Sequence, residues 1–580
     1  MIYIEINKKN YSNNLKYIHI DESLNYPFKI KVSIIPGLDE LLKEPFIHKQ
    51  VLIKFDENCQ EKDSFTWCMP VDKKTYFGYV FKEKRLFTSD NDFNELLLTV
   101  YHPLFLLVSA RRFQIFYEKS LFDIFYVMLK SYQEVFSKYN IDKPQISETL
   151  KSIILPYCTQ YLEDDLSFIS RLCETYGARI ILHNKKILIQ GLDTPFKLSY
   201  LNICKIPSEA RIKKTEELYS ISRHLFHRNI LCTEKTEDLT TTEEKTSPPK
   251  EALEPQPYWM ELDVNDPEIA KKQLHVHKLS IEHQQSSITI YNSPSFNNKP
   301  LVGLRCGDII TLPNETIQYY IHKIECHCDE DIVIKALKHN FDYEIIIHAT
   351  KTNLPYVMPP IHKKPRVHSL IRALVVEPLM SVDGDPDKLG RIKVRFLWDE
   401  SENTTCWVRL MMPYAGKQHG IYVMPELNDE VLIGFEGGDI DRPYCLGSIY
   451  NMDNTTLQQM TSAEQMETIM IRTPQNMYLK FHETNKGKQE YKINIQDNII
   501  VNAIKDKKEL NYKIKCLGDA NSAIQLDGKG NISVESDKKI VISSKQITVN
   551  GSDLLILQGG EIQIKSPGEI IVNGQVIRLN

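Results

Sequence analysis

The chain has 580 residues, a formal net charge of −5 and twelve cysteines. The length corresponds to about four domains of ordinary size, and the acidic balance argues against a general nucleic-acid binder. No apolar run approaches the ~20 residues of a membrane-spanning helix, and the start, MIYIEINKKNYSNN, lacks the features of a signal peptide. We therefore expect a product that begins in the cytoplasm and keeps its cysteines reduced in the core.

The N-terminal part predicts strands. Alternating apolar residues mark KIKVSII (29–35) and KQVLIKF (49–55). Residues 233–257 are polar, charged and rich in proline, which predicts a loop or linker. Strands are expected again from about 273 to 350, before a proline-rich connector at 356–369.

Two helices are expected between these strand regions. Helical spacing of apolar residues predicts one helix in KSLFDIFYVMLKSYQEVF (119–136), with Ser120 and Asp123 as a capping box. EDDLSFISRLCETYG (163–177) predicts the other, which Asp164 or Asp165 caps and Gly177 ends. Capping also explains this acidic run better than acid–base chemistry does.

Candidate metal ligands occur in two places. HKIECHCDE contains His322, Cys326, His327 and Cys328, and LHVHK contains His275 and His277. On a strand, Cys326 and Cys328 would face opposite to His327, and no second pair lies at finger-like spacing. The two histidines of LHVHK would share a strand face, but no third ligand is in view. We predict no metal site, no cofactor and, without a nucleophile elbow or phosphate loop, no enzyme.

A compact all-β block is expected at 366–452. Its strands are RIKVRFLW (391–398), CWVRLMM (406–412), GIYVMP (420–425) and DEVLIGFEGG (429–438), and GDPDKLG before them is a turn. Five or six short strands in ~80 residues suit a small barrel of the oligonucleotide/oligosaccharide-binding (OB) type.

The last part of the chain repeats a pair of aliphatic residues two positions apart, which places both side chains on one face of a strand. The pairs begin seven or eight residues apart and are Ile524/Leu526, Ile532/Val534, Ile540/Ile542, Ile547/Val549, Leu555/Leu557, Ile562/Ile564, Ile570/Val572 and Ile577/Leu579. One chain winding alone would form only a ~13 Å stub, whereas three intertwined chains would form a prism ~40 Å long. We favour the trimeric prism, with these pairs as its core and every strand hydrogen-bonded to other chains, over a single-chain solenoid or flexible repeats.

The OB block carries a longer signature. It reads D-x-LGR-x-KV-x-F-x-W, CWVR, AGK-x-x-G, P-x-x-x-x-EV and F-x-x-GD-x-DRP-x-x-x-G-x-x-YN, and it includes Leu389, Gly390, Arg391, Trp398, Cys406, Trp407, Val408, Arg409, Gly416, Gly420, Asp439, Asp441, Arg442, Pro443, Tyr450 and Asn451. This signature resembles that of the VgrG (valine-glycine repeat protein G) spikes of type VI secretion, which are related to the myophage baseplate hub and central spike. YHPLFLLVSARRFQIFYEKSLFDIFYVML and LRCGDIITL resemble the hub segments of that family. Tyr414 departs from the family, which usually has Trp there, and literal Val-x-Gly repeats are lacking.

The resemblance implies a fold that is mainly β with a few helices. Residues 1–365 would be a hub-like region with two β-barrels, 366–452 the OB barrel, and 453–580 a neck and an intertwined triple-stranded β-helix. It also implies a homotrimeric puncturing spike that carries effectors across target membranes, present in the cytoplasm before firing and then secreted or injected. The alternative is a spike of an extracellular contractile injection particle or phage-like tail, or a receptor-binding trimeric fibre module.

The implied partners are a hexameric, Hcp-like tube protein, baseplate proteins, effectors and a tip protein of the PAAR-repeat type, with no nucleic acid. The last apolar layer of the prism predicts that the tip protein binds at residues 570–580.

Overall fold

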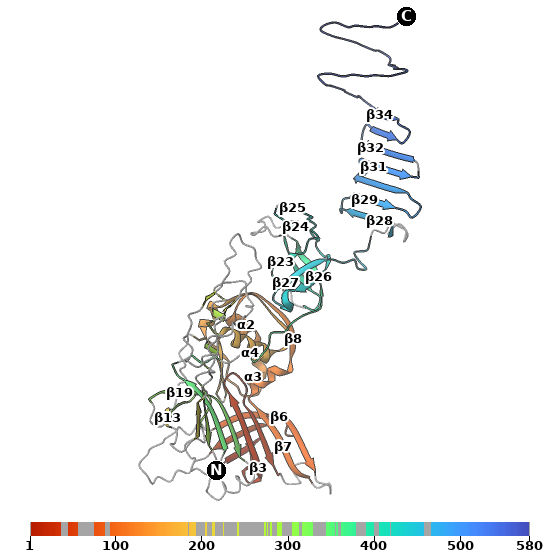
Figure 1. The fold of residues 1–580 in the computed structure, drawn as a ribbon. Helices are drawn as coiled ribbons and strands as arrows, with labels where there is room; N and C mark the ends of the chain where they lie inside the picture. The colour runs from red at the N-terminus through yellow and green to blue at the C-terminus, as the bar shows by residue number, and fades with distance from the viewer. Residues whose placement is uncertain are drawn as a thin grey trace. The chain divides into compact units, whose positions relative to one another are not determined.

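The computed structural model describes residues 2–35, 45–55, 75–87, 93–192 apart from 184, 304–328 apart from 313–315, 344–357 apart from 354, 361–378, 390–399, 405–456 apart from 418, and 466–578 apart from 508, with short stretches between 203 and 292. The chain divides into two units, Met1–Asn454 and Thr455–Asn580 (Figure 1). The predicted mainly β fold is confirmed. The predicted linker 233–257 lies outside the described residues apart from β16 (Thr241–Thr242), which pairs with β15 (His224–Leu225).

The first unit contains a sheet of 13 strands. Its main path is β14 (Arg211–Lys214), β17 (Ser287–Asn292), β20 (Glu344–Lys351), β19 (Gln318–Cys328), β3 (Leu15–Ser23), β4 (Lys29–Ile34), β7 (Phe93–Tyr101), β6 (Thr75–Phe87), β5 (Gln50–Phe55), β1 (Ile2–Ile6) and β2 (Lys9–Asn10). Off this path, β18 (Ile309–Thr311) pairs with β19, and β13 (Ile203–Lys205) pairs with β18. The strands predicted at 29–35 and 49–55 are confirmed as β4 and β5. The pairing of β19 with β3 makes the sheet continuous, and one apolar core extends across both halves. The division into two barrels stays a prediction.

A buried ion pair joins the two halves of this sheet. Arg305 Nε lies 2.9 Å from both carboxylate oxygens of Glu22 on β3, and its Nη1 donates to the carbonyl of Thr75 at 2.8 Å. The guanidinium also stacks 3.9 Å from the ring centre of Tyr76, whose hydroxyl donates to Glu22. The charges of the pair are therefore surrounded by polar partners, which a buried charge requires.

Helices and two small sheets form a second core. The sheets are β8 (Arg111–Ser120) with β10 (Ile154–Asp164), and β11 (Arg179–His183), β12 (Lys186–Gln190) and β9 (Gln145–Ile146). Its helices include α2 (Leu121–Lys130), α3 (Gln133–Lys138) and α4 (Asp165–Tyr176), and the 3-10 turns among the described residues of the unit are Ser12–Asn14, Pro103–Ser109, Glu148–Ser152 and Glu436–Gly438. None of the described helices has the length and apolar character needed to cross a membrane.

Both predicted helix starts are confirmed. Ser120 accepts from the backbone N–H of Asp123, and Asp164 accepts from that of Ser167. Gly177 ends α4 at φ 74°. The single helix predicted at 119–136 is wrong, because the chain breaks into α2 and α3 around Tyr132, whose hydroxyl donates to the buried Asp165.

A closed five-stranded barrel completes the first unit, as the OB prediction requires. Its strands are β21 (Ile371–Pro378), β22 (Arg391–Phe396), β23 (Val408–Leu410), β27 (Pro443–Ser448) and β26 (Glu430–Phe435). The strand predicted at 420–425 is wrong. Only Gly420 pairs, in the hairpin of β24 (Ala415–Gly416) and β25 (His419–Gly420), and Ile421, Tyr422 and Val423 are exposed.

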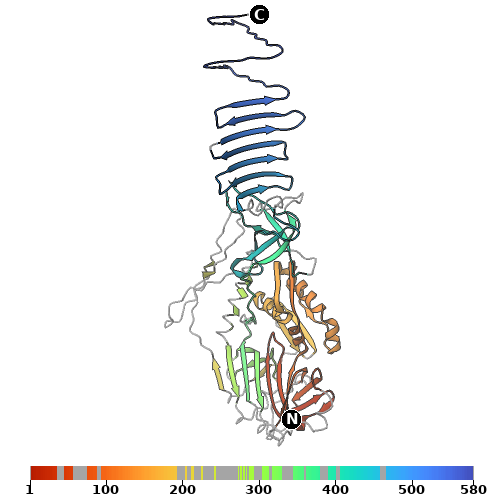
Figure 2. The same cartoon turned by 90° about the vertical axis from the view of Figure 1, so that its right-hand side faces the viewer.

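The second unit contains one antiparallel sheet in which consecutive strands are neighbours (Figure 2). Its strands are β28 (Thr468–Arg472), β29 (Met477–Glu483), β30 (Gln489–Ile495), β31 (Ile499–Asp506), β32 (Glu509–Cys516), β33 (Ser522–Asp527) and β34 (Ile532–Ser536). Their ladder hydrogen bonds lie within the chain. The prediction that every strand bonds to other chains is therefore wrong for this part, because tight hairpins bring consecutive strands together first.

Candidate functional site: an uncovered apolar sheet face

One face of the β28–β34 sheet is apolar along its whole length. Directly opposite residues on antiparallel strands point to the same face, so the register defines rows across the sheet. The first row is Ile471, Leu479, Ile493, Val501, Ile514, Ile524 and Val534, and the second is Ile469, Phe481, Tyr491, Ala503, Tyr512, Leu526 and Ile532. The intervening residues form a mostly polar face, which also contains Ile500 and Ile504. Its central row is Met470, Lys480, Lys492, Asn502, Lys513, Gln525 and Ser533.

The apolar face is uncovered in the single chain. Ile469 is 73% exposed, and Ile471, Phe481, Ile524 and Val534 are also exposed. A contiguous exposed apolar surface that extends over seven strands marks a candidate site of protein association. The face is therefore the strongest candidate for a functional surface in this unit.

The first two of the eight aliphatic pairs lie on this face. Ile524 and Leu526 lie on β33, and Ile532 and Val534 on β34, all on the apolar side. The strands predicted for these two pairs are confirmed. Their side chains are nevertheless exposed in the single chain, because nothing within it covers the face.

In the single chain, the later aliphatic pairs do not form the strands and the core that were predicted for them. They lie in described residues that form no strand, and their side chains are exposed rather than buried in a core; they are Ile540, Ile542, Ile547, Val549, Leu555, Leu557, Ile562, Ile564, Ile570, Val572 and Ile577. Leu579 lies outside the described residues. The physical reason is that these segments have no ladder partner among the described residues, so one copy forms neither their strands nor their core.

The sequence prediction missed the apolar rows before Ile524. The same spacing of two is present in Ile469/Ile471, Leu479/Phe481, Tyr491/Ile493, Val501/Ala503 and Tyr512/Ile514. These strands are longer and carry aromatic residues, so their pairs begin 10 to 12 residues apart and do not match the shorter later repeat. A search for alternation, rather than for a fixed period, would have found them.

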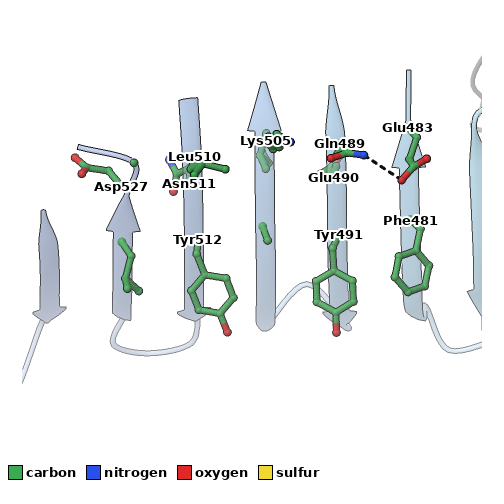
Figure 3. Close-up of a pocket in the computed structure, with 14 residues that line it drawn as sticks. Phe481, Glu483, Gln489, Glu490, Tyr491, Lys505, Leu510, Asn511, Tyr512 and Asp527 are labelled. Carbon is green, nitrogen blue, oxygen red and sulfur yellow. Dashed lines mark hydrogen bonds between the residues drawn. The ribbon is translucent and has the colours of Figure 1, made fainter. Parts of the chain in front are cut away.

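A hollow of about 440 Å³ lies on the sheet (Figure 3). Phe481, Tyr491, Ala503, Tyr512 and Leu526 line it, and they form one continuous stretch of the second apolar row. Figure 3 shows the rings of Phe481, Tyr491 and Tyr512 lying along the strands, with Glu483, Gln489 and Lys505 at one end.

In the first unit, the OB signature residues gather around the barrel. Gly390 has φ 61°, which favours glycine, and Arg391 and Arg409 are opposite each other on β22 and β23. Trp398 packs against Phe113 and Tyr161 of the β8–β10 sheet. Trp407 lies beside Lys393, Cys406 is half-buried and Val408 is buried. Gly416 and Gly420 lie in the β24–β25 hairpin, and Pro443 lies on β27. Tyr450 is exposed, Asn451 donates to Glu430, and Leu389 lies outside the described residues.

The GD-x-DRP part of the signature forms a clasp on the connector. Lys364 Nζ lies 2.7 Å from Asp439 and 2.8 Å from Asp441, and Arg442 lies 3.7 Å from Asp439. Burial acts to raise the pKa of Asp439, but the Lys364 ammonium, the backbone N–H of Asp441 and the Arg442 guanidinium together outweigh it and the pKa is lowered. The pKa of Asp441 is raised, by burial first, against the pull of Lys364. One ammonium thus holds two buried carboxyl groups.

Replacing Lys364 with Met is expected to destabilise the first unit by about 3 kcal/mol at pH 7, because two buried carboxylates lose their shared cation. Without the cation their folded-state pKa values rise above the unfolded values, so the loss should shrink as pH falls and both groups protonate. Urea unfolding at pH 7 and pH 4.5 measures this difference. An equal loss at both pH values would contradict the electrostatic role of Lys364.

The prediction that Cys326 and Cys328 face opposite to His327 on β19 is confirmed. Cys326 and Cys328 are buried in the core, whereas His327 faces His19, with 2.9 Å between the Nδ1 atoms. His322 is the extra residue of a β-bulge. The described residues contain no group of three ligands suited to a metal ion. The strand expected for LHVHK is wrong, since His275 lies in helical residues; His277 lies outside the described part.

Three histidines lie close together at the bulge: His322 itself, the buried His283 and the partly buried His348. The rings of His283 and His322 are 5.5 Å apart, and those of His322 and His348 are 6.1 Å apart. Burial lowers the pKa of His283 to about 4 and that of His322 to about 3, and it also lowers the pKa of His348. Lys323 adds to the lowering at His322 and His348, whereas Glu325 opposes it at His348.

These shifts predict acid sensitivity of the hub sheet. A buried neutral histidine binds its proton more readily in the unfolded chain, so its contribution to stability is lost as pH falls from about 6.5 toward the lowered folded-state pKa. Each such group removes up to about 1.4 kcal/mol per pH unit in that window. We expect His322→Phe to flatten the dependence of unfolding free energy on pH between 6.5 and 4.5. An unchanged slope would show that His322 already titrates normally in the folded protein.

Comparisons with known proteins agree with this architecture. Residues 21–187 match the phage tail baseplate hub (GPD) family, and residues 375–450 match the type VI secretion system/phage-baseplate injector OB domain. Two parts of the first unit are thus similar to a baseplate hub and to an injector OB domain. The resemblance to the VgrG family predicted from the sequence motifs is confirmed by these matches together with the relatives below.

The type VI secretion system spike protein VgrG5 of Pseudomonas aeruginosa is 26% identical over 332 residues, which are 51% of this chain and 40% of VgrG5. VgrG1a of the same organism is 33% identical over 128 residues, 20% of each chain. The match therefore spans less than half the length of these relatives. A solved structure of the lidded Francisella PdpA-VgrG complex covers 92% of this chain and 79% of its own, with a TM-score of 0.54 and 11% identity, so this likeness concerns the fold alone.

Proposed function

We propose that this chain is a subunit of a homotrimeric, non-enzymatic puncturing spike at the tip of a type VI contractile injection apparatus. The observation that carries the proposal is the uncovered apolar face of β28–β34, continued by exposed aliphatic pairs up to Ile577. This surface follows hub and OB modules in the same chain. A baseplate or spike role is common to the relatives; puncturing and effector transport belong to the proposal.

Three copies would cover the apolar face around a common axis. The pairs after Val534 are only two aliphatic residues wide, so two facing strands would leave their sides open to water. Three such strands can enclose a dry core, and each new layer would supply the ladder partners that the single chain lacks. The predicted core residues from Ile524 to Leu579 would then face this axis.

We assign one proposed role to each of the three predicted domains. Residues 1–365 would form the hub, whose two similar halves in three subunits match a hexameric tube ring. Residues 366–452 would form the OB collar, which the signature residues hold to the connector. Residues 453–580 would form the neck and prism, and contraction of a separate sheath would drive it through the target membrane.

The proposed partners come from the family resemblance. They are a hexameric tube protein, baseplate proteins, effectors and a PAAR-type tip protein that contacts residues 570–580. The spike would be assembled in the cytoplasm and then leave the producing cell with the tube.

The solution mass of the full chain tests the proposal. One chain has a mass of 67.4 kDa, so we expect a particle of about three times that value at micromolar concentration. A mass of one chain, or of two, would contradict the trimer.

A further inference from the structure

The second apolar row is interrupted at one position. Phe481, Tyr491 and Tyr512 are large, but Ala503, which lies directly opposite both Tyr491 and Tyr512 on the strand between them, has a single methyl group. The hollow of about 440 Å³ lies at this interruption, where a water molecule would fill only ~30 Å³. A hollow of this size on a face that becomes buried must be filled, because an empty apolar cavity is destabilising.

The aromatic residues beside the hollow are not equivalent. The rings of Phe481 and Tyr491 contact each other, with centroids 5.4 Å apart. Tyr512 makes no such ring contact among the described residues, and it is 38% exposed. Phe481 is equally open to solvent, at 43%, but its ring is already paired with Tyr491, so Tyr512 is the ring of the three without a ring partner in the described part of its own chain. Aromatic rings gain most when they are buried in a fitted pocket.

We infer that Tyr512 of one copy inserts into the hollow over Ala503 of a neighbouring copy, and that this knob and hole fix the register of the assembled sheets. The inference rests on the proposed trimer. The occupant is a second copy because the hollow lies within the apolar rows that a second copy would cover, and because the same row supplies both the small residue and the free ring. Large side chains opposite small ones are the usual means by which facing layers interdigitate.

Register matters here because the apolar rows repeat almost uniformly along the sheet. Neighbouring copies of such a surface could slip by one strand, about 4.8 Å, and still bury aliphatic side chains. Ala503 is the one residue of the second row from β28 to β34 that is neither aromatic, leucine nor isoleucine. A slipped copy would place Tyr512 against a large residue instead, which overpacks the contact.

A double-substitution experiment on the full-length protein tests the inference. Tyr512→Ala empties the hollow, and Ala503→Phe fills it from the same chain, so each is expected to lower the temperature at which trimers dissociate by about 5 °C or more. The combination should recover to within about 2 °C of the parent, because the new ring replaces the missing one. Tyr512→Phe keeps the ring and should behave as the parent.

Ala523 provides the matched control, since it lies on the polar face opposite Lys515 and Glu535. Ala523→Phe adds the same ring away from the apolar rows and should leave dissociation unchanged. Additive losses in the double variant, or an equal effect of Ala503→Phe and Ala523→Phe, would overturn the inference while the trimer stands. A parent protein that is monomeric by native mass spectrometry would overturn both this inference and the proposed trimer.

Discussion

Replacing Leu555 with Asp is expected to abolish a heat-resistant trimer, whereas replacing the adjacent Ile556 with Asp should leave it intact. Both residues are exposed in the single chain, at 53% and 67%, so the chain alone does not distinguish them. Leu555 and Leu557 form one of the aliphatic pairs, and Ile556 lies between them on the other side of an extended chain. In the trimer, Leu555→Asp would place three unpaired carboxylates around the axis, at a cost of several kcal/mol each.

Native mass and resistance to dissociation on heating measure this difference. The two variants carry the same new charge on adjacent aliphatic residues, so a change in solubility or net charge affects both alike. Equal loss in both variants would mean that the segment does not alternate between an axis and water. Equal tolerance would mean that no common apolar axis exists.

Breaking the buried pair between Arg305 and Glu22 is the second change with a large expected effect. Arg305→Met should destabilise the first unit by about 3 to 5 kcal/mol, because the Glu22 carboxylate stays buried without its partner. The side chains of the pair are only 6% and 7% exposed. Chemical unfolding of the full chain, followed by near-UV signals of the hub tyrosines, measures the loss.

Lys151→Met is the control for this prediction. Lys151 pairs with Glu148 at 2.5 Å, but both side chains are more than half exposed, so the loss should stay below about 1 kcal/mol. Replacing Glu22 and Arg305 together by Leu and Met should cost less than the two single changes combined, because no charge remains buried. Fully additive losses would show that the pair does not act as a unit.

Local features of this fold could be predicted from the sequence. The caps at Ser120 and Asp164 and the end of a helix at Gly177 depend on neighbouring residues alone, and each lies where the motif indicates. The OB barrel was also predictable, because its signature combines strand alternation with glycines at turns. The spacing of Ile524/Leu526 and Ile532/Val534 likewise placed each pair on one face of its strand.

Contacts between distant residues could not be predicted in this way. Tyr132 interrupts a regular helical pattern because its hydroxyl reaches Asp165, 33 residues away. Arg305 finds Glu22 across 283 residues, and no local pattern marks either one as a partner. The strand expected at 420–425 failed for a related reason: after the N–H of Ile421, which donates to the carbonyl of Tyr414, the segment leaves the β24–β25 hairpin, and Ile421, Tyr422 and Val423 remain exposed.

The in-chain ladder of β28–β34 has a consequence for the order of assembly. Each hairpin there joins two strands that are consecutive in the sequence, so the entropy cost of closing its loop is small. The sheet can therefore form strand by strand within a newly made chain. The residues from 537 to 578 form no such ladder, and in the proposed trimer they would pair only after other copies have bound. We therefore expect biphasic refolding, with a fast phase independent of protein concentration and a slower phase that accelerates as concentration rises. The preformed sheets would serve as the nucleus. The three copies of the remaining segment would then pair with one another progressively from residue 537 onward.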